Sequence, residues 1–405
     1  MKRVFSFIVL VTLGTLSLFA ASNVNKKAEK QMKADMETVK TNIKSGKDLD
    51  KMEMLVRKHL GDSLFSDNMN LRALLADVIK KQYEDGNEKM YLRSSVDTAR
   101  LIHTGRKMFV ACQQLDSIDA RPNEKGLSVL TYRKRNADYL APYRKNIFKG
   151  GLYFFNHQKW SEAYDMLDTY IDCRKQPLFS STPLDSLSDN YAAYVALVAA
   201  SNMHDFEKAR KYETEALRYE PAREISLIIL AEMARLNNNQ EKFKDYLQMG
   251  FEQNPKSSYF FPYLIDYYSN RDDYESAMYY TDKALQTDSL NEIFLLAKHS
   301  TLMSMKEYDK SLEYGIKVLN VNDTISKANY NVGYIYYQKA QNAMKISGVP
   351  YRQRTRNAQK YYLLCKPYME KYRKACPDDK ERWRPVLYDV YLNLNLGKEF
   401  QELDK

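Results

Sequence analysis

The sequence predicts an all-α solenoid of helical hairpins, and two observations lead to this prediction. The 405 residues include only 13 glycines and 11 prolines, and no stretch alternates apolar and polar residues as a strand would. Between residues 189 and 323, the same kinds of residue recur at a spacing of 34. Three columns at this spacing are Phe206, Gln240, Tyr274 and Tyr308; Ala209, Phe243, Ala277 and Ser311; and Ala216, Gly250, Ala284 and Val318. A fixed period of this length indicates repeats that bury their surfaces against their neighbours.

The chain begins with the pattern of an export signal. Lys2 and Arg3 precede an uncharged apolar run, Val4–Ala20, and small residues up to Ser22 provide a cleavage site. We therefore predict a signal peptide over residues 1–22 and a protein whose body lies outside the cytoplasm. The alternative is an uncleaved N-terminal anchor, although the apolar run barely reaches the roughly 20 residues that span a bilayer.

The next part of the chain, residues 23–141, is predicted to form irregular helical hairpins. Apolar residues at helical spacing and turn residues between them define the expected segments. The expected helices are Lys26–Ser45, Leu49–Leu60, Asn70–Glu84 and Ser94–Leu115. The turn after the third of them is assigned to Asp85-Gly86-Asn87.

From residue 142 to residue 405 the repeats are explicit. The first unit carries Gly151, Phe154, Trp160 and Ala163, and an inserted loop over Gln176–Ser188 follows it. Later in the chain, one hairpin is lengthened over residues 339–360, with its turn at Gly348-Val349-Pro350.

Residues 142–405 resemble tetratricopeptide-repeat (TPR) proteins, of the exported kind found in Gram-negative cell envelopes. The residues that carry the resemblance are the three columns above, two prolines at the same spacing, Pro221 and Pro255, and Gly333 and Trp383. The resemblance implies a right-handed superhelix whose concave face binds other proteins and which has no enzymatic activity of its own. It also implies a periplasmic or envelope-associated location.

The inward positions of the TPR pattern, on the first helix of each hairpin, are largely aromatic in this chain. They are Phe148, Phe155, Tyr191, Tyr194, Tyr259, Tyr330, Tyr334, Tyr337, Tyr388 and Tyr391. Tyr330, Tyr334 and Tyr337 follow each other at i, i+4 and i+7, which places them on one stripe of a helix. We predict that these three, with Tyr191, Tyr194, Tyr388 and Tyr391, bind a partner, because rigid aromatic side chains are favoured at interfaces. The alternative is that the rings pack between repeats as core.

The lengthened hairpin is strongly basic near its turn. Residues 339–360 contain no acidic residue and six basic ones: Lys339, Lys345, Arg352, Arg354, Arg356 and Lys360. We predict that Arg352, Arg354 and Arg356 contact an acidic partner or the headgroups of a membrane surface. The alternative is a charged tip that is only solvated.

The sequence offers no catalytic residue, metal site or cofactor motif. Its five histidines are His59, His103, His157, His204 and His299, and none has metal-ligand spacing. No phosphate-binding loop, dinucleotide fingerprint or nucleophile elbow is present. The formal charge of +10, from 62 basic and 52 acidic residues, permits an acidic partner, and nucleic acid is not expected for an exported protein. A disulfide between Cys112 and Cys173 is possible, and four buried free thiols are the favoured interpretation.

These observations predict a protein-interaction scaffold or adaptor of the cell envelope, with a protein partner whose identity the sequence does not give. The alternative is a module that binds glycan or peptidoglycan, because aromatic side chains also stack on sugar rings. A third hypothesis, an enzyme with its site in the irregular N-terminal half, rests only on the absence of clear repeats there.

Overall fold

The computed structural model describes residues 25–123 and 125–403, and these residues contain helices, turns and loops but no β-strand. The predicted signal peptide, residues 1–22, lies outside the described residues. The chain divides into two compact units, Met1–Ile229 and Leu230–Lys405. The boundary predicted between residues 141 and 142 falls at the 3₁₀ turn Ala141–Tyr143 within the first unit. Among the described helices, none combines the length and apolar composition that crossing a bilayer requires.

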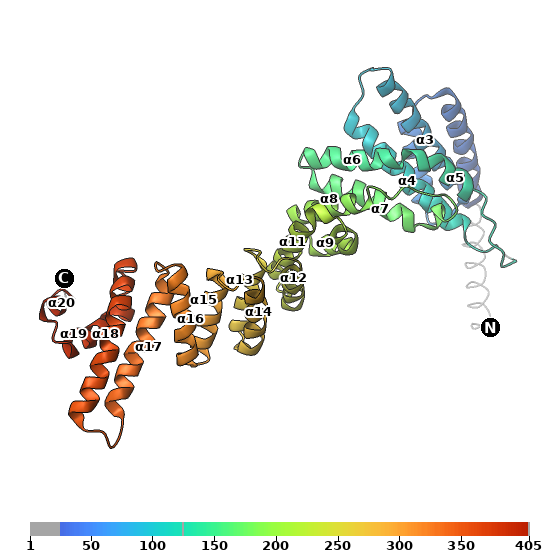
Figure 1. Cartoon of the computed structure of the whole chain (residues 1–405). Helices are drawn as coiled ribbons and strands as arrows, with labels where there is room; N and C mark the ends of the chain where they lie inside the picture. The colour runs from blue at the N-terminus through green and yellow to red at the C-terminus, as the bar shows by residue number, and fades with distance from the viewer. Residues whose placement is uncertain (1–24, 124, 404–405) are drawn as a thin grey trace, which may run out of the picture. The chain divides into compact units, whose positions relative to one another are not determined.

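The first unit is a stack of helices that run back and forth along the chain (Figure 1). Its first described helix covers residues 25–45. The helices that follow are α2 (Leu49–Leu60), α3 (Met69–Tyr91), α4 (Thr98–Asp119), α5 (Arg133–Leu140), α6 (Arg144–Asn156), α7 (Trp160–Asp172), α8 (Asp189–Asn202), α9 (Phe206–Lys211) and α10 (Glu213–Leu217). Helix α11 (Arg223–Leu236) contains the division between the units.

The turn predicted at Asp85-Gly86-Asn87 is wrong, because α3 continues through these residues to Tyr91. Gly86 serves helix packing instead of a turn: a Cβ atom built on it would lie 2.8 Å from Cδ1 of Leu101 on α4. The glycine therefore allows α3 and α4 to approach closely. The chain turns later, at Arg93, whose φ of 54° is left-handed.

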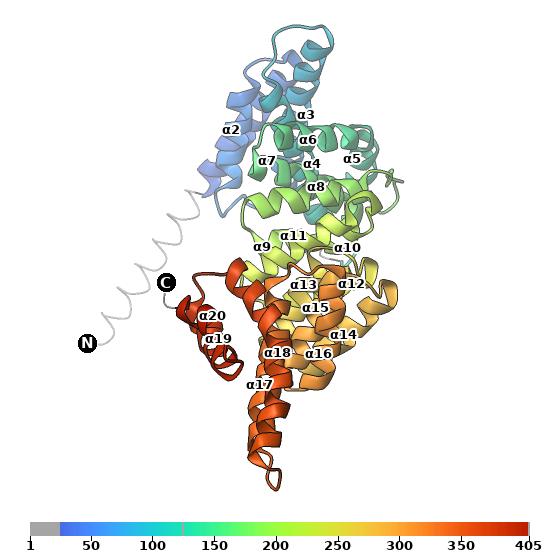
Figure 2. The ribbon, with the colours of Figure 1, turned by 60° about the vertical axis from the view of Figure 1, so that its left-hand side comes forward.

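The second unit continues as helical hairpins. Its helices are α12 (Gln240–Gln253), α13 (Phe260–Ser269), α14 (Tyr274–Thr287), α15 (Glu292–Ser304), α16 (Tyr308–Val321), α17 (Ser326–Lys345), α18 (Tyr351–Ala375), α19 (Lys380–Asn393) and α20 (Gly397–Gln401). The lengthened hairpin is confirmed as α17 and α18, with the turn at Gly348, whose φ is 76°. Figure 2 shows its closed end projecting past the neighbouring α16.

The 34-residue period is visible in the backbone, which confirms the solenoid of helical hairpins. The second helices of four consecutive hairpins, α9, α12, α14 and α16, begin at the members of the first column. Two residues before each start, the backbone turns left-handed, with φ between 55° and 61°, at His204, Asn238, Asp272 and Lys306. The residue in between caps the helix in three of the four cases: Asp205, Asn239 and Asp273 each accept a hydrogen bond from the backbone N–H three residues on. The same left-handed turn at Gln158 and Asn395 extends the pattern to α7 and α20.

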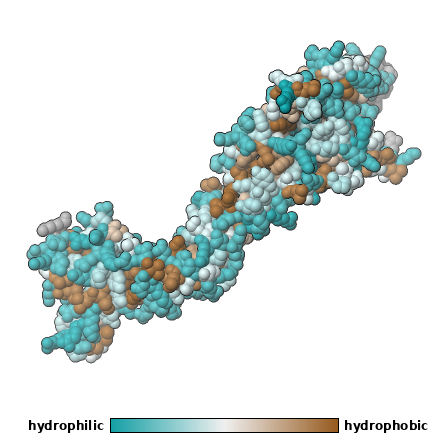
Figure 3. Space-filling view, turned by 45° about the horizontal axis from the view of Figure 1, so that its top comes forward, coloured by the Kyte–Doolittle hydropathy of each residue, from teal (hydrophilic) through white to brown (hydrophobic). Residues whose placement is uncertain are grey.

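The columns of small residues mark where helices meet. Ala209, Ala277 and Ser311 are at most 1% exposed, and so are Ala216, Ala284 and Val318. The face drawn in Figure 3 is mostly hydrophilic and carries its hydrophobic residues in separate groups. Tyrosine scores as slightly hydrophilic on the hydropathy scale of that figure, so tyrosine clusters do not stand out in it as brown patches.

Candidate functional site

The predicted stripe of Tyr330, Tyr334 and Tyr337 lies along α17 and is half-buried. We call these three residues the tyrosine stripe. The rings of Tyr330 and Tyr334 are stacked, with centroids 5.8 Å apart and planes at 21°, and Tyr337 lies 6.2 Å beyond Tyr334. Tyr330 also packs 5.0 Å from Tyr372 on α18. The three rings therefore belong partly to the core of the second unit, which holds each of them in a fixed orientation.

The hydroxyl groups of the tyrosine stripe differ in their partners. The Tyr337 hydroxyl donates to Oδ2 of Asp389 on α19 at 2.7 Å, and burial together with this carboxylate raises the pKa of Tyr337. The hydroxyls of Tyr330 and Tyr334 have no hydrogen-bond partner in the described part of the protein. The guanidinium of Arg382, on α19, lies 5.5 Å from the centre of the Tyr330 ring and is largely exposed. Two oriented rings with free hydroxyls therefore lie beside an accessible cation.

Two further tyrosines predicted to bind a partner, Tyr388 and Tyr391, lie on α19, and they differ in exposure. Tyr391 is 2% exposed, and its hydroxyl donates to Glu370 at 2.9 Å. Burial and this carboxylate raise the pKa of Tyr391. The prediction that Tyr391 offers its ring to a partner therefore needs correction, since the ring is core. Tyr388 is 47% exposed, and its ring contacts Phe400 of α20 at 4.7 Å.

The first unit carries a second group of half-buried rings, which we call the first-unit aromatic cluster: Phe148, Tyr191, Tyr194 and Tyr219. The Tyr219 ring centroid lies 5.2 Å from that of Tyr191 and 5.7 Å from that of Tyr194. Phe148 on α6 approaches Tyr191 at 6.0 Å. Tyr219 could not be predicted from the TPR pattern. It follows the second helix of its hairpin, whereas the inward positions of the pattern lie on the first helix.

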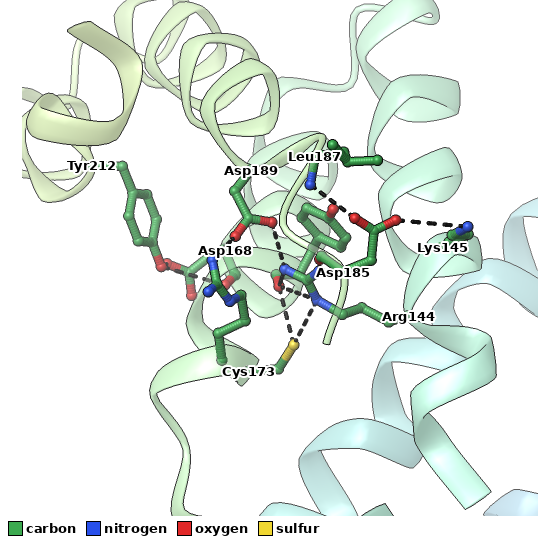
Figure 4. Close-up of polar contacts among 10 residues, drawn as sticks. Arg144, Lys145, Asp168, Cys173, Asp185, Leu187, Asp189 and Tyr212 are labelled. Atoms are coloured by element: carbon green, nitrogen blue, oxygen red, sulfur yellow. Dashed lines mark hydrogen bonds and ion pairs between the residues drawn. The ribbon is translucent and has the colours of Figure 1, made fainter. Parts of the chain in front are cut away.

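A buried arginine, Arg144, lies beside Tyr170, whose ring centroid is 5.1 Å from that of Phe148 in the first-unit aromatic cluster. Figure 4 shows the polar contacts of this arginine. Arg144 of α6 is 3% exposed, and its guanidinium carbon lies 3.7 Å from the ring centre of Tyr170 on α7. Its Nη2 donates to Asp189 at 2.7 Å and to the carbonyl of Tyr170 at 2.9 Å, and its Nη1 donates to the carbonyl of Asp185. Arg174 also donates to Asp189, at 2.6 Å. This network ties α6, α7, the inserted loop Gln176–Ser188 and the start of α8 together.

The side chains at two further inward positions, Tyr259 and Phe155, make their contacts within the protein. The hydroxyl of Tyr259 donates to Glu232 at 2.6 Å, and burial and this carboxylate raise the pKa of Tyr259. Phe155 packs edge-on against Trp160, with ring centroids 5.3 Å apart. These two side chains therefore contribute to packing and leave no free polar group for a partner.

The four cysteines are free thiols, and Cys112, Cys173 and Cys365 are buried. The favoured interpretation of buried thiols is thus confirmed for these three. Burial raises the pKa of the Cys112 and Cys173 thiols to about 11, the latter in spite of the Arg144 guanidinium beside it. Both thiols are therefore protonated near neutral pH, which removes their nucleophilic form. No cluster of His, Cys, Asp and Glu within residues 25–123 and 125–403 is placed to hold a metal ion.

The basic residues of the lengthened hairpin do not all face outward. Arg352 and Arg356 are exposed. Arg354 turns inward: its Nη1 donates to the carbonyl of Met344 at 2.9 Å and so closes the end of α17. Of the three arginines predicted to contact a partner, only Arg352 and Arg356 are therefore open to one.

Solved structures that resemble the chain are TPR proteins. The C-terminal part of a TPR repeat-containing protein from Cytophaga hutchinsonii is 14% identical over 62% of this chain and 90% of its own, with a TM-score of 0.40. A TPR repeats protein from Bacteroides fragilis is 14% identical over 62% of this chain and 98% of its own, with a TM-score of 0.31. YrrB, described as a TPR protein with an unusual peptide-binding site, is 14% identical over 47% of this chain and 88% of its own, with a TM-score of 0.33. No protein-family model and no curated protein matches the chain.

Proposed function

We propose that this protein is a non-enzymatic interaction scaffold that holds a segment of a partner protein on the tyrosine stripe. The observation that carries the proposal is the pair Tyr330 and Tyr334, stacked at 5.8 Å and half-buried, with no hydrogen-bond partner for either hydroxyl among the residues that the structure describes. Packing against Tyr372 already fixes the Tyr330 ring, so a partner need not restrict that side chain on binding. Oriented aromatic rings of this kind are favoured where one protein recognises another.

The chemistry of the stripe favours a polypeptide segment. Tyr330 and Tyr334 offer apolar ring surface together with two hydroxyl donors, which suit the side chains and backbone carbonyls of an extended segment. Arg382 adds a guanidinium that lies 3.6 Å from the Asp379 carboxylate and also contacts the Tyr372 hydroxyl. A carboxylate on the partner would find this cation within reach of the rings.

We further propose that the protein works outside the cytoplasm, attached to or enclosed by the cell envelope. This proposal rests on residues 1–22 of the sequence. It is tested by mass spectrometry of the protein isolated from its own cells. A mature chain that begins at Asn23 supports export with cleavage, and an intact N-terminus in the soluble cytoplasmic fraction would contradict it.

Photocrosslinking in the intact cell tests the scaffold function directly. A photoreactive phenylalanine derivative replaces Tyr334 in one variant and Tyr279 in a matched control. Tyr279 lies on α14 and is 60% exposed, so it reports collisions with any protein in the surroundings. We expect a polypeptide adduct from position 334 that is absent from position 279 and that disappears when Tyr330→Ala is added.

The other outcomes are equally informative. Equal adducts from both positions, or none from position 334, would rule out the tyrosine stripe as the binding surface. An adduct from position 334 that contains sugar and no polypeptide would contradict the scaffold function and support the glycan-binding alternative. Circular dichroism of the Tyr330→Ala variant ensures that loss of the adduct is not loss of the fold.

A further inference from the structure

The closed end of the α17–α18 hairpin exposes apolar side chains at its very tip. We call residues 345–360 the hairpin tip. Ile346 is 48% exposed and Tyr351 is 69% exposed, and they lie on either side of the turn at Gly348. The Arg354 side chain donates to the Met344 carbonyl at 2.9 Å across the turn, and the Pro350 carbonyl accepts the first backbone hydrogen bonds of α18, from Gln353 and Arg354 at 2.9 and 3.0 Å. The apolar end is thus a formed structure and not a loose loop.

Directly behind the apolar end lie cations that the fold does not neutralise. Lys345, Arg352, Arg356 and Lys360 are exposed, and no carboxylate in the described part of the chain pairs with any of them. The neighbouring Lys339 differs, because its ammonium group forms an ion pair with Asp309 of α16. The hairpin tip therefore carries five positive charges and no negative one, and four of its five cations are exposed.

These cations do not serve the stability of the helix that carries them. The first turn of α18 contains no acidic residue and includes Arg352. The N-terminal end of a helix carries partial positive charge, so cations there oppose the helix dipole. A helix selected only for stability would carry aspartate or glutamate at these positions. The charge is thus better explained by something outside the molecule.

We propose that the hairpin tip docks onto a membrane surface that contains anionic phospholipid. Ile346 and Tyr351 would enter the headgroup region, where tyrosine is favoured and where amphipathic segments bury about 5–10 Å. At 1.5 Å rise per residue, Arg356 lies about 8 Å and Lys360 about 14 Å behind Tyr351 along α18. The apolar residues thus reach deepest, and the cations follow at the level of the lipid phosphates.

This ordering by depth distinguishes a lipid surface from an acidic protein. An acidic polypeptide would account for the unpaired Arg352 and Arg356, but it gives no reason for an exposed isoleucine and tyrosine at the extreme end. A bilayer interface accounts for both features, because anionic headgroups attract the cations and the acyl boundary accepts the apolar side chains. This proposal does not depend on the tyrosine stripe, so either proposal can be correct while the other is wrong.

Tryptophan fluorescence in the full chain provides a local test. The chain has two tryptophans, so Tyr351→Trp adds a third reporter at the hairpin tip, and Tyr279→Trp places one on α14 as a control. Each variant is mixed with vesicles of phosphatidylcholine alone, or of an equimolar mixture of phosphatidylcholine and phosphatidylglycerol, in which the acyl chains carry bromine as a quencher. We expect quenching of the added tryptophan at position 351 on the anionic vesicles only, and none at position 279.

Charge removal completes the test. Adding Arg352→Gln and Arg356→Gln should weaken binding to the anionic vesicles about 30-fold, since each cation near such a surface contributes about fivefold. Lys374→Gln with Lys380→Gln removes the same charge far from the tip and should have no comparable effect. No quenching at position 351, or quenching unaffected by the arginine changes, would overturn the proposal. Retention on immobilised polyglutamate that depends on both arginines, with tryptophan 351 unquenched, would also overturn it in favour of an acidic polypeptide.

Discussion

Replacing Gly250 by alanine should destabilise the second unit, although alanine is the better helix former. A Cβ atom on Gly250 of α12 would lie 2.3 Å from two ring atoms of Phe260, and Phe260 is fully buried at the start of α13. Normal carbon contacts lie at about 3.5–4.0 Å, so the ring cannot keep its place. Overpacking of this kind costs about 1–3 kcal/mol, and the helix propensity of alanine returns about 1 kcal/mol. We therefore expect a net loss of up to about 2 kcal/mol.

Other repeats show how the size of the residue at this position relates to the size of the residue that packs against it. Ten residues after each member of the Gly250 column, the partner residue changes in size: Val318 is followed by Ala328, and Gly250 by Phe260. Val318 and Ala328 pack in one buried cluster. These two pairs match a large residue with a small one, whereas Ala216 is followed by Ser226 and Ala284 by Phe294. Gly250→Ala breaks this match, and adding Phe260→Leu should recover part of the loss.

Urea unfolding followed by circular dichroism measures the size of the effect, and hydrogen exchange of α12 and α13 locates it. Ala284→Gly, at the same position of the next repeat, is the control, and it should cost at least about 1 kcal/mol, because helix propensity falls and a buried methyl group is lost. The reasoning is refuted if Gly250→Ala is as stable as the parent chain or more stable. It is also refuted if Phe260→Leu makes the alanine variant worse.

Three further predictions concern buried polar groups. Arg144→Met should destabilise the first unit by up to about 3 kcal/mol in urea unfolding, because Asp189 stays buried and loses one of its two arginine partners; a change below about 0.5 kcal/mol would contradict this. Iodoacetamide labelling at pH 8, read by mass spectrometry, should modify the partly exposed Cys376 well before Cys173, whose pKa is raised by burial to about 11. Burial lowers the pKa of His299, so the unfolded chain takes up a proton more readily as the pH falls below about 6.5. Stability should therefore decrease from pH 7 to pH 5, and less so in His299→Gln.

The repeat pattern could be predicted from the sequence because its causes are local. A left-handed turn, a capping side chain and an aromatic residue at the start of the second helix recur at fixed spacing, as at Asp272, Asp273 and Tyr274. Gly86 shows the limit of such local reading. A glycine between Asp85 and Asn87 has the composition of a turn, but its role is set by Leu101 on another helix. Arg144 was missed as a buried anchor for the same reason, since its partners lie 26 to 45 residues away.

The tyrosines show why the binding surface was harder to predict than the fold. Tyr334, Tyr337 and Tyr391 all occupy inward positions of the repeat, and nothing in their local sequence separates them. The difference comes from carboxylates elsewhere in the chain: Asp389, 52 residues from Tyr337, and Glu370, 21 residues from Tyr391, accept their hydroxyl hydrogens. Tyr334 meets no such acceptor in the part of the chain that the structure describes. A half-buried hydroxyl that the fold itself leaves unmatched is available to another molecule, which is why the proposed binding surface centres on Tyr330 and Tyr334 and omits Tyr391.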